Sequence, residues 1–353
     1  MKVLKGLRSR WSRSYNDMSE TLLEDYVGEQ APKGLRYSLF GVTLLSVLLV
    51  LLGWYWSDEP DLFDVEAINS QQAQPVIGAA TTSTLIHVID VMLEKPGGYL
   101  ANDVTPPGLW LDNLPSWEFG ALVQVRDLSK AMRESFSRSQ SQSTEDRDLA
   151  LAEPRFNVDH QSWAVPWPER EYADGRDYLQ NYLLRLSDEQ DYDAQFYARA
   201  DNLRYWLGTV ETRLGSLSQR LSASVGQRRI NTDLAGAADA RQSTASPREL
   251  VVKTDWLLID NVFYEARGTS WALLHFLQAI EIDFADVLKK KNARTSVQQI
   301  VRELEMTQQP VHAPVIVNGE GFGLLANHSL VMASYISRAN AAIIDLRELL
   351  SQG

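Results

Sequence analysis

The sequence predicts an all-α protein, in which a single N-terminal transmembrane helix precedes an elongated helical bundle with coiled-coil-like helices. Three observations lead to this fold class. Residues 37–56 are a continuous run without charge, and two later segments repeat apolar residues at alternating spacings of three and four. The third is that helical patterns never alternate with short strands, as they would in an α/β protein. The 353 residues are 44% hydrophobic and 23% charged, which is usual for a globular chain.

The uncharged run is long enough to cross a bilayer. At a rise of about 1.5 Å per residue it spans roughly 30 Å, the thickness of a hydrocarbon core. Tyr37 at one end and Trp54, Tyr55 and Trp56 at the other end match the aromatic belts of membrane interfaces. We therefore expect residues 37–56 to contact the lipid bilayer as an uncleaved signal anchor.

The flanking charges predict the orientation of this helix. Seven basic residues precede it, at positions 2, 5, 8, 10, 13, 33 and 36, whereas acidic residues at 58, 59, 61, 64 and 66 follow it. The positive-inside rule then places residues 1–36 in the cytoplasm and residues 57–353 outside it. We expect a single-pass membrane protein with its N-terminus in the cytoplasm and its C-terminal domain on the other side of the membrane.

The cytoplasmic arm has a pattern of its own. Leu4, Leu7, Trp11, Tyr15 and Met18 recur every three or four residues, with basic residues between them. This favours a basic amphipathic helix on an anionic membrane surface. The alternative is a solvated arm whose charges only fix the topology.

Composition excludes several classes of function. The chain has no cysteine, so it has neither disulfides nor a cysteine nucleophile. A formal net charge of −12 argues against nucleic acid as the main partner. No motif in the chain points to a cofactor, and none is expected.

Residues 57–245 form the first predicted helical region. A helix over 81–94 ends at Pro96-Gly97-Gly98, and a second is expected from about 116 to 137. Residues 137–148 are polar and predict a connector, and 152–170 predict a loop with buried Trp163 and Trp167. A coiled-coil-like helix is expected over 188–222, started by Ser187 and Gln190 as a capping box. The apolar seam of this helix would pack either within a helical hairpin or between protomers. Residues 222–246 are expected to form a linker.

Residues 246–353 are expected to form a C-terminal helical region packed on the first. Ser246, Pro247 and Glu249 predict a helix start, with the helix running to about 291 and a possible interruption at Gly268. A short helix should cover 296–307, and residues 314–323 contain one extended run. The last helix, from about 322 to 350, repeats the coiled-coil spacing.

A few polar residues in otherwise apolar helices are the candidate site. They are Tyr264, Glu265, Arg267, Asn318, Asn327, His328, Tyr335 and Arg338. One interpretation is a shared pocket for an anionic ligand or a partner's carboxylate. The other is a buried Glu–Arg pair and helix contacts that fix the register of the bundle. The glycine-rich run after Asn318 lacks the spacing of a nucleotide-binding loop and predicts a tight turn.

No metal site is expected. His87, Asp90 and Glu94 share one helix face, which could provide half of a metal site. However, the chain has only five histidines and no H-E-x-x-H motif, so a solvated face is the preferred interpretation.

Two stretches carry a resemblance to a known family. They are FYEARGTSWALLHFLQAIEIDF (263–284) and NGEGFGLLANHSLVMASYISRANAAIIDLRELL (318–350). Together with the N-terminal anchor and the length, they resemble a proteobacterial family of single-span membrane proteins known as domain of unknown function 2333. The resemblance implies a Gram-negative inner membrane with the bulk of the chain in the periplasm, and it offers no catalytic residues.

These observations favour a non-catalytic scaffold or adaptor of the cell envelope that binds a protein partner, or itself, through its helical seams. A lipid- or small-molecule-binding bundle with Arg267 and Arg338 around the ligand is the alternative. A third, an envelope hydrolase using Glu265 or Glu320, has less support because no catalytic motif accompanies these carboxylates.

Overall fold

The computed structural model describes residues 33–70, 76–139, 143–188, 193–230, 249–313, 315–319 and 324–352. It divides into two compact units, residues 1–54 and 55–353, each of which is treated by itself. The predicted amphipathic helix of the cytoplasmic arm lies almost wholly outside the described residues.

The first unit contains most of helix α2, Lys33–Trp56. Among the described residues α2 is the one helix long and apolar enough to cross a membrane, with a mean hydropathy of 2.1. Its leucine, valine and phenylalanine side chains are exposed, except for the half-buried Leu49. Length and composition thus fit a membrane anchor or a signal sequence.

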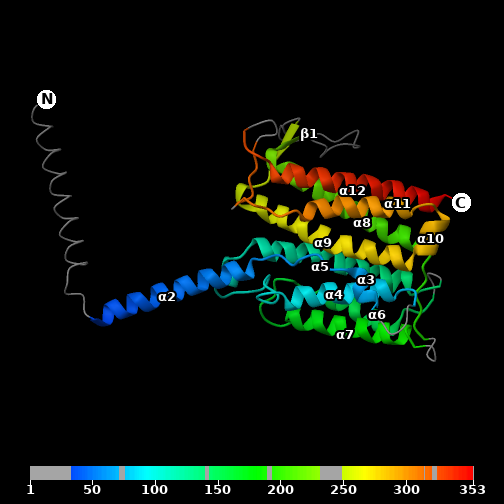
Figure 1. The fold of residues 1–353 in the computed structure, drawn as a ribbon, viewed down its shortest axis with the longest axis horizontal. Coiled ribbons are helices and arrows are strands. Elements are labelled where there is room, and N and C mark those ends of the chain that lie inside the picture. Colours follow the sequence, from blue (N-terminus) through cyan, green and yellow to red (C-terminus); the bar gives the residue numbers. More distant parts are fainter. Residues whose placement is uncertain are drawn as a thin grey trace, which may run out of the picture. The chain divides into compact units, whose positions relative to one another are not determined.

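The second unit is helical, as predicted, and we call it the helical domain (Figure 1). Its α-helices are α3 Val65–Ser70, α4 Ala79–Glu94, α5 Asn113–Ala131, α6 Arg147–Phe156, α7 Pro168–Leu186, α8 Ala200–Ser222, α9 Ile259–Asp283, α10 Ala285–Lys290, α11 Arg294–Glu305 and α12 His328–Ser351. The described strands, β1 Gln227–Ile230 and β2 Glu249–Val252, form one antiparallel ribbon with Arg228 opposite Val251.

Helix α9 lies at the centre of the domain. It packs on α4 and α5 on one side and on α8, α11 and α12 on the other (Figure 1). The helix continues through Gly268, without the interruption that the sequence allows there. A Cβ atom at Gly268 would come within 1.9 Å of the Trp117 carbonyl oxygen on α5, and one at Gly120 within 2.1 Å of the Glu265 carbonyl oxygen. The two glycines therefore let the α5 and α9 backbones touch.

The two predicted apolar seams pack on each other within one chain. Helices α8 and α12 lie side by side, and their seam residues are buried. On α8 these are Leu203, Leu207, Val210, Leu214, Leu217 and Leu221, and on α12 they are Met332, Ile336, Ala339, Ile343, Leu346 and Leu350. Helix α8 begins at Ala200, not at residue 188, and α12 begins at His328 behind the cap residue Asn327. Residues 190 and 322, which the predicted starts used, lie outside the described residues.

The prediction of a loop with buried tryptophans over 152–170 is wrong in two respects. Pro154 lies within α6, and Pro168 begins α7, where the missing amide hydrogen costs no helical bond. Trp163 and Trp167 are exposed, with 69% and 56% of their surface accessible, rather than buried. Helix α7 and the short α3 were not predicted.

The predicted helix over 246–291 is also wrong at its start. Residues 249–252 form β2, a 3₁₀ turn covers Trp256–Leu258, and α9 begins only at Ile259. Cross-strand pairing of Val251 and Val252 with β1 outweighs the local helix-start pattern, since β-branched residues suit a strand. The helix predicted over 116–137 differs slightly: α5 begins at Asn113, and a π turn, Met132–Phe136, follows it.

Candidate functional site

The segment that follows α2 is bound along one stripe of α9. We call residues 57–66 the strap. Every fourth residue of α9 contacts the strap or the start of α4, and a spacing of four keeps these side chains on one helix face. The stripe consists of Arg267, Trp271, His275, Ala279 and Asp283.

Arg267 fixes the first part of the strap. Its Nε donates to Glu59 Oε2 at 2.7 Å, and its Nη1 donates to the carbonyl oxygens of Thr307 and Gln309 at 3.0 and 2.9 Å. Burial raises the pKa of the Glu59 carboxyl, although the guanidinium acts in the opposite direction. The interpretation that Arg267 belongs to a buried Glu–Arg pair therefore fits, with Glu59 rather than Glu265 as its partner.

Trp271 and His275 bind the next residues. Trp271 Nε1 donates to the Asp61 carbonyl oxygen at 3.1 Å, and the Phe63 amide donates to His275 Nε2 at 3.1 Å. Since Nε2 accepts, we assign the ring proton to Nδ1, which donates to the Trp271 carbonyl oxygen at 2.7 Å. The Phe63 ring stacks on His275 with centroids 3.7 Å apart. Burial lowers the pKa of His275 to about 4, so this histidine is neutral at pH 7.

The last two members of the stripe hold α3 and α4. Ala279 packs against Val65 and Ala80 in a small buried cluster. Asp283 accepts hydrogen bonds from the Gly78 amide at 2.8 Å and from the amide and hydroxyl of Thr81 at 2.6 Å each. A carboxylate is thus placed at the N-terminus of α4, where it interacts favourably with the helix dipole.

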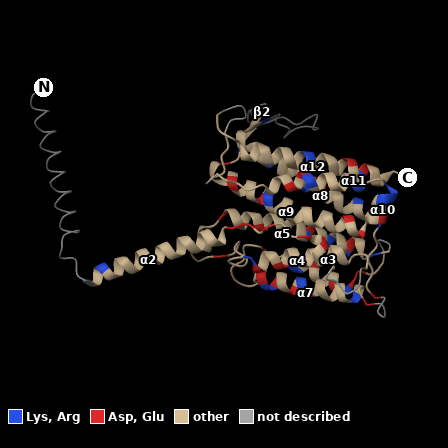
Figure 2. Ribbon diagram, in the orientation of Figure 1, with Lys and Arg blue, Asp and Glu red and all other residues tan. Residues whose placement is uncertain are grey.

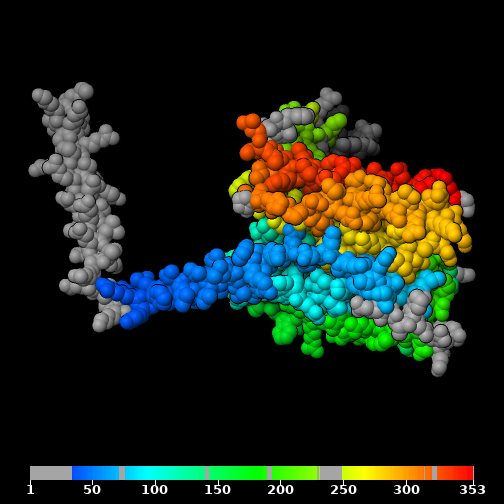
Figure 3. All heavy atoms as spheres, viewed as in Figure 1, coloured from blue at the N-terminus to red at the C-terminus, as the bar shows by residue number. Residues whose placement is uncertain are grey.

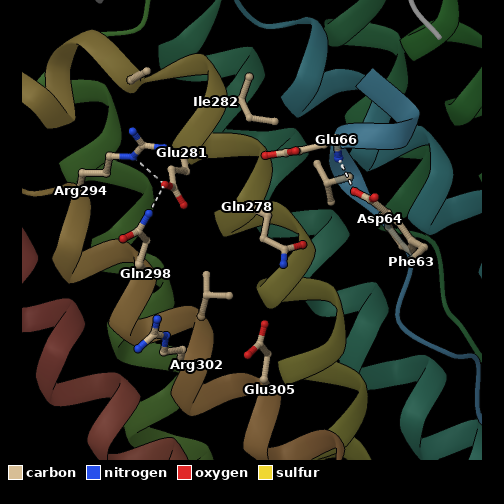
Figure 4. Close-up of a pocket in the computed structure, with 13 residues that line it drawn as sticks. Phe63, Asp64, Glu66, Gln278, Glu281, Ile282, Arg294, Gln298, Arg302 and Glu305 are labelled. Atoms are coloured by element: carbon tan, nitrogen blue, oxygen red, sulfur yellow. Dashed lines mark hydrogen bonds and ion pairs between the residues drawn. The ribbon is translucent and has the colours of Figure 1, made fainter. Parts of the chain in front are cut away.

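Three hollows border the strap. Asp58, Glu59, Pro60 and Asp61 lie between a hollow of about 420 Å³ next to α4 and one of about 690 Å³ next to Arg267 and Tyr264. The third and largest, of about 770 Å³, begins at Phe63 and extends between α3, α9 and α11. We call this third hollow the groove (Figure 4).

The groove carries both signs of charge. Glu281 accepts from Arg294 Nε at 2.8 Å and from Gln298 Nε2 at 2.7 Å, as the dashed lines in Figure 4 mark. Across the described residues, no hydrogen bond or ion pair engages the side chains of Glu66, Arg302 or Glu305, which also line it. Within that part of the chain, the groove therefore contains charged side chains that are not paired.

The comparisons with known proteins give a family. One family model, described as an uncharacterized protein conserved in bacteria (domain of unknown function 2333), matches residues 30–353. The chain belongs to this family. Neither the curated proteins nor the solved structures yield a match. The suspected resemblance is confirmed, and the match covers the strap, the stripe of α9 and the groove.

The structure separates the two arginines of the predicted pocket. Arg267 is buried beneath the strap, whereas Arg338 is half exposed on α12 and donates to Glu303 of α11 at 2.8 Å. The guanidinium of Arg338 also lies over the Tyr335 ring, 4.5 Å from its centroid. The two arginines have no partner in common among the described residues.

Three other predicted site residues build the turn before α12. Asn327 Oδ1 accepts from the Leu330 amide at 2.8 Å and caps α12, and Asn318 Oδ1 accepts from the Ser329 amide at 3.3 Å. His328 Nδ1 accepts from the Val317 amide at 3.0 Å. The three residues thus stabilise the start of α12, while residues 320–323, on which the predicted tight turn falls, lie outside the described residues.

Tyr264 and Glu265 take different positions. Tyr264 lines the hollow next to Arg267, and burial raises the pKa of its hydroxyl. Glu265 forms a two-point ion pair with Arg220 of α8, at 2.6 and 2.5 Å. Of the two carboxylates considered for hydrolysis, one is thus engaged by an arginine and the other, Glu320, is outside the described residues.

The face with His87, Asp90 and Glu94 lines the hollow next to α4. Asp90 accepts from Arg176 at 3.0 Å, and burial lowers the pKa of His87. Within the described ranges, no group of three histidine, aspartate or glutamate side chains could hold a metal ion.

One buried ion pair was not foreseen. Glu118 on α5 is fully buried and contacts Lys95 Nζ at 2.5 Å, and it accepts from the amides of Leu100 and Ala101 at 2.9 and 2.8 Å. Burial raises the pKa of Glu118 to about 7 despite these donors. In the sequence both residues occur within ordinary helix patterns, so only their neighbours in space reveal the pair.

Proposed function

We propose that this chain is a non-catalytic scaffold or adaptor of the bacterial cell envelope. In this proposal α2 anchors it in the inner membrane, residues 57–353 lie in the periplasm, and the helical domain binds a partner protein. Membership of a bacterial family and the apolar helix support the coarse part of the proposal. The charge asymmetry around α2 supports the orientation.

The observation that carries the proposal is the bound strap. Directly after the apolar helix, the chain is hydrogen-bonded to α9 at Glu59, Asp61 and Phe63. The strap joins the start of the helical domain to its central helix, so these residues belong to the folded domain and are not a loose linker. A domain that is ordered from its first residues supports a role in which it presents a fixed surface to a partner.

The groove is the surface that we assign to the partner. The seams of α8 and α12 are occupied by each other, so another surface must be used. The groove offers the charged side chains of Glu66, Arg302 and Glu305 beside apolar Ile282 and Val301. Mixed charge around apolar contacts suits a transient protein interface.

The orientation can be tested directly because the chain has no cysteine. Arg204 is exposed on α8, and Ser9 lies before α2. We expect a membrane-impermeant maleimide to label Arg204→Cys in cells with a permeabilised outer membrane, and to label Ser9→Cys only after the inner membrane is opened. The reverse pattern, or an intact chain released from the membrane, would reject the anchored periplasmic topology.

The adaptor role can be tested by site-specific photocrosslinking in the native membrane. A photoreactive amino acid replaces Arg302 in the groove, and Arg204, another exposed helical arginine, serves as the matched control. We expect a discrete protein adduct from position 302 and not from 204, reduced several-fold by Glu66→Lys. No adduct from any groove position would contradict the proposal.

A small-molecule role has one observation in its favour, the hollow of about 690 Å³ next to Arg267, which has the size of a ligand site. However, Asp58, Glu59 and Asp61 line it, and Glu59 already neutralises Arg267. This lining disfavours an anion. A reproducible small mass on the intact protein in native mass spectrometry, lost in Tyr264→Ala, would establish this second function.

A further inference from the structure

We propose that one end of the helical domain rests in the interface of the same bilayer that α2 spans. We call this the anchor end: it comprises the described parts of the loops 95–112, 157–167, 223–258 and 306–327. The inference rests on the proposed membrane anchoring of α2 and adds a second, peripheral membrane contact.

The chain enters the helical domain at the anchor end. Trp56, the last residue of α2, packs on the core of the domain, and a Cβ at Gly97 would lie 2.8 Å from its ring. Residues 54–56 are the interfacial aromatic belt of a span that ends here. Whatever packs around Trp56 therefore lies at the level of the lipid headgroups.

The other loops lie at the same end as Trp56. A hollow of about 530 Å³ is lined jointly by Leu100, Leu109, His160 and Leu258, which belong to three of these loops. The fourth loop joins them at the start of α12, where the His328 ring lies 6.3 Å from Phe263 near the start of α9. Figure 1 shows the corresponding helix ends gathered at one end of the domain.

These loops expose an unusual set of large apolar side chains. Trp256 is 83% exposed, and the others that are more than half exposed include Leu109, Trp110, Trp163, Val165, Trp167, Leu257 and Leu325. Exposing four tryptophan side chains to water is unfavourable, so such a cluster marks an interaction surface. Tryptophan is enriched at membrane interfaces, where its apolar ring contacts lipid and its N–H group contacts water.

The opposite end of the helical domain differs. There Asp286, Lys289 and Lys290 of α10 are exposed, together with Arg147 and Asp193. Figure 2 shows basic residues around α10. Ile77 and Leu184, near the starts and ends of helices at that end, are also more than half exposed, but both are aliphatic. Among the described residues of the helical domain, the four exposed tryptophans all belong to the loops at the end that receives Trp56, which argues for a membrane interface.

The chemistry of the contact is apolar insertion and not charge attraction. Among the described exposed residues of the anchor end, Asp112, Asp159, Glu249 and Asp255 are acidic and only Arg228 and Lys253 are Lys or Arg, and the whole chain carries −12. Acidic groups are repelled by anionic headgroups. We therefore expect the contact to form on zwitterionic phosphatidylcholine and to persist at high salt.

The test uses the full chain reconstituted in phosphatidylcholine vesicles, with single cysteines carrying an environment-sensitive fluorophore. Leu109→Cys and Trp256→Cys report on the anchor end. Ile77→Cys is the matched control, because Ile77 and Leu109 are aliphatic, are 57% and 58% exposed, and flank opposite ends of α4. Val47→Cys, in the middle of α2, reports on anchoring itself.

We expect several-fold higher emission at positions 109 and 256 than at 77, with quenching by lipids spin-labelled near the headgroup. If position 47 is quenched by lipid while 109 and 256 behave like 77, the inference is overturned and anchoring stands. If position 47 is not quenched, the anchoring on which the inference rests fails. Emission that rises at 109 and 256 without lipid quenching would mean that a protein surface covers the anchor end, which also overturns the inference.

Discussion

The two ends of α4 are closed by buried carboxylates that work in different ways. At the anchor end Glu118 is paired with a buried ammonium, Lys95, and also receives backbone amides. At the opposite end the donors to Asp283 within the described residues are neutral groups of Gly78, Ala80 and Thr81. The anchor end thus contains a buried charge that must be compensated inside the protein, whereas the opposite end is stabilised by hydrogen bonds and the helix dipole.

The largest loss of unfolding free energy is expected from a substitution at the anchor end. Glu118→Gln leaves the Lys95 ammonium buried without a counterion, and this should lower the free energy of unfolding by about 3–5 kcal/mol. Chemical denaturation of the full chain in detergent measures it. The double variant Glu118→Gln/Lys95→Met should recover much of the loss, because no buried charge remains. Equal instability of the single and double variants would show that Glu118 acts mainly through the amides of Leu100 and Ala101.

The next largest effect is a pH dependence of the unfolding free energy that arises from His275, on the stripe of α9 between the two ends. The pKa of His275 is lowered from 6.5 to about 4 in the folded state, so folding excludes a proton that the unfolded chain binds. This contribution to stability is complete above pH 6.5 and is lost as the pH falls to about 4, a change of about 3 kcal/mol.

Acidic residues also change the unfolding free energy over this pH range. Subtracting the value for His275→Gln from that for the wild type at each pH leaves the contribution of His275. The difference in unfolding free energy between the wild type and the variant should shrink as the pH falls from 7 to 4. A difference that stays constant over this range would show that His275 titrates normally in the folded protein.

A smaller effect is expected at the opposite end. Asp283→Asn keeps the shape of the side chain and one acceptor for Thr81 but removes the charge at the α4 N-terminus. We expect a loss of about 1–3 kcal/mol, less than for Glu118→Gln, because no buried cation is left unpaired. Thermal unfolding of the two variants side by side gives the order. A larger loss for Asp283→Asn would reverse the distinction between the two ends.

The smallest effect concerns the exposed surface of the anchor end. Trp256→Ser removes a side chain that is 83% exposed, so the free energy of unfolding in detergent should change by no more than about 0.5 kcal/mol. The same variant should reduce the lipid quenching at position 109 in vesicles. A strong loss of stability in detergent would instead show that Trp256 has a structural role.

The sequence alone determined the features that depend on local periodicity and composition. The uncharged run predicts α2, the Pro96-Gly97-Gly98 stop ends α4 near Glu94, and the spacing of three and four identifies the buried seams of α8 and α12. Each of these follows from the geometry of a single helix, so neighbouring residues are sufficient to reveal it.

Only the tertiary structure decided which side chains meet across the chain. The Phe63 amide binds His275, 212 residues later, and Arg267 pairs with Glu59 rather than with the nearby Glu265. Likewise, residues 249–252 form a strand because β1 lies beside them, although the local pattern favours a helix. Such contacts depend on how the helices pack, and packing sums many weak interactions between residues far apart in sequence, which no local pattern encodes.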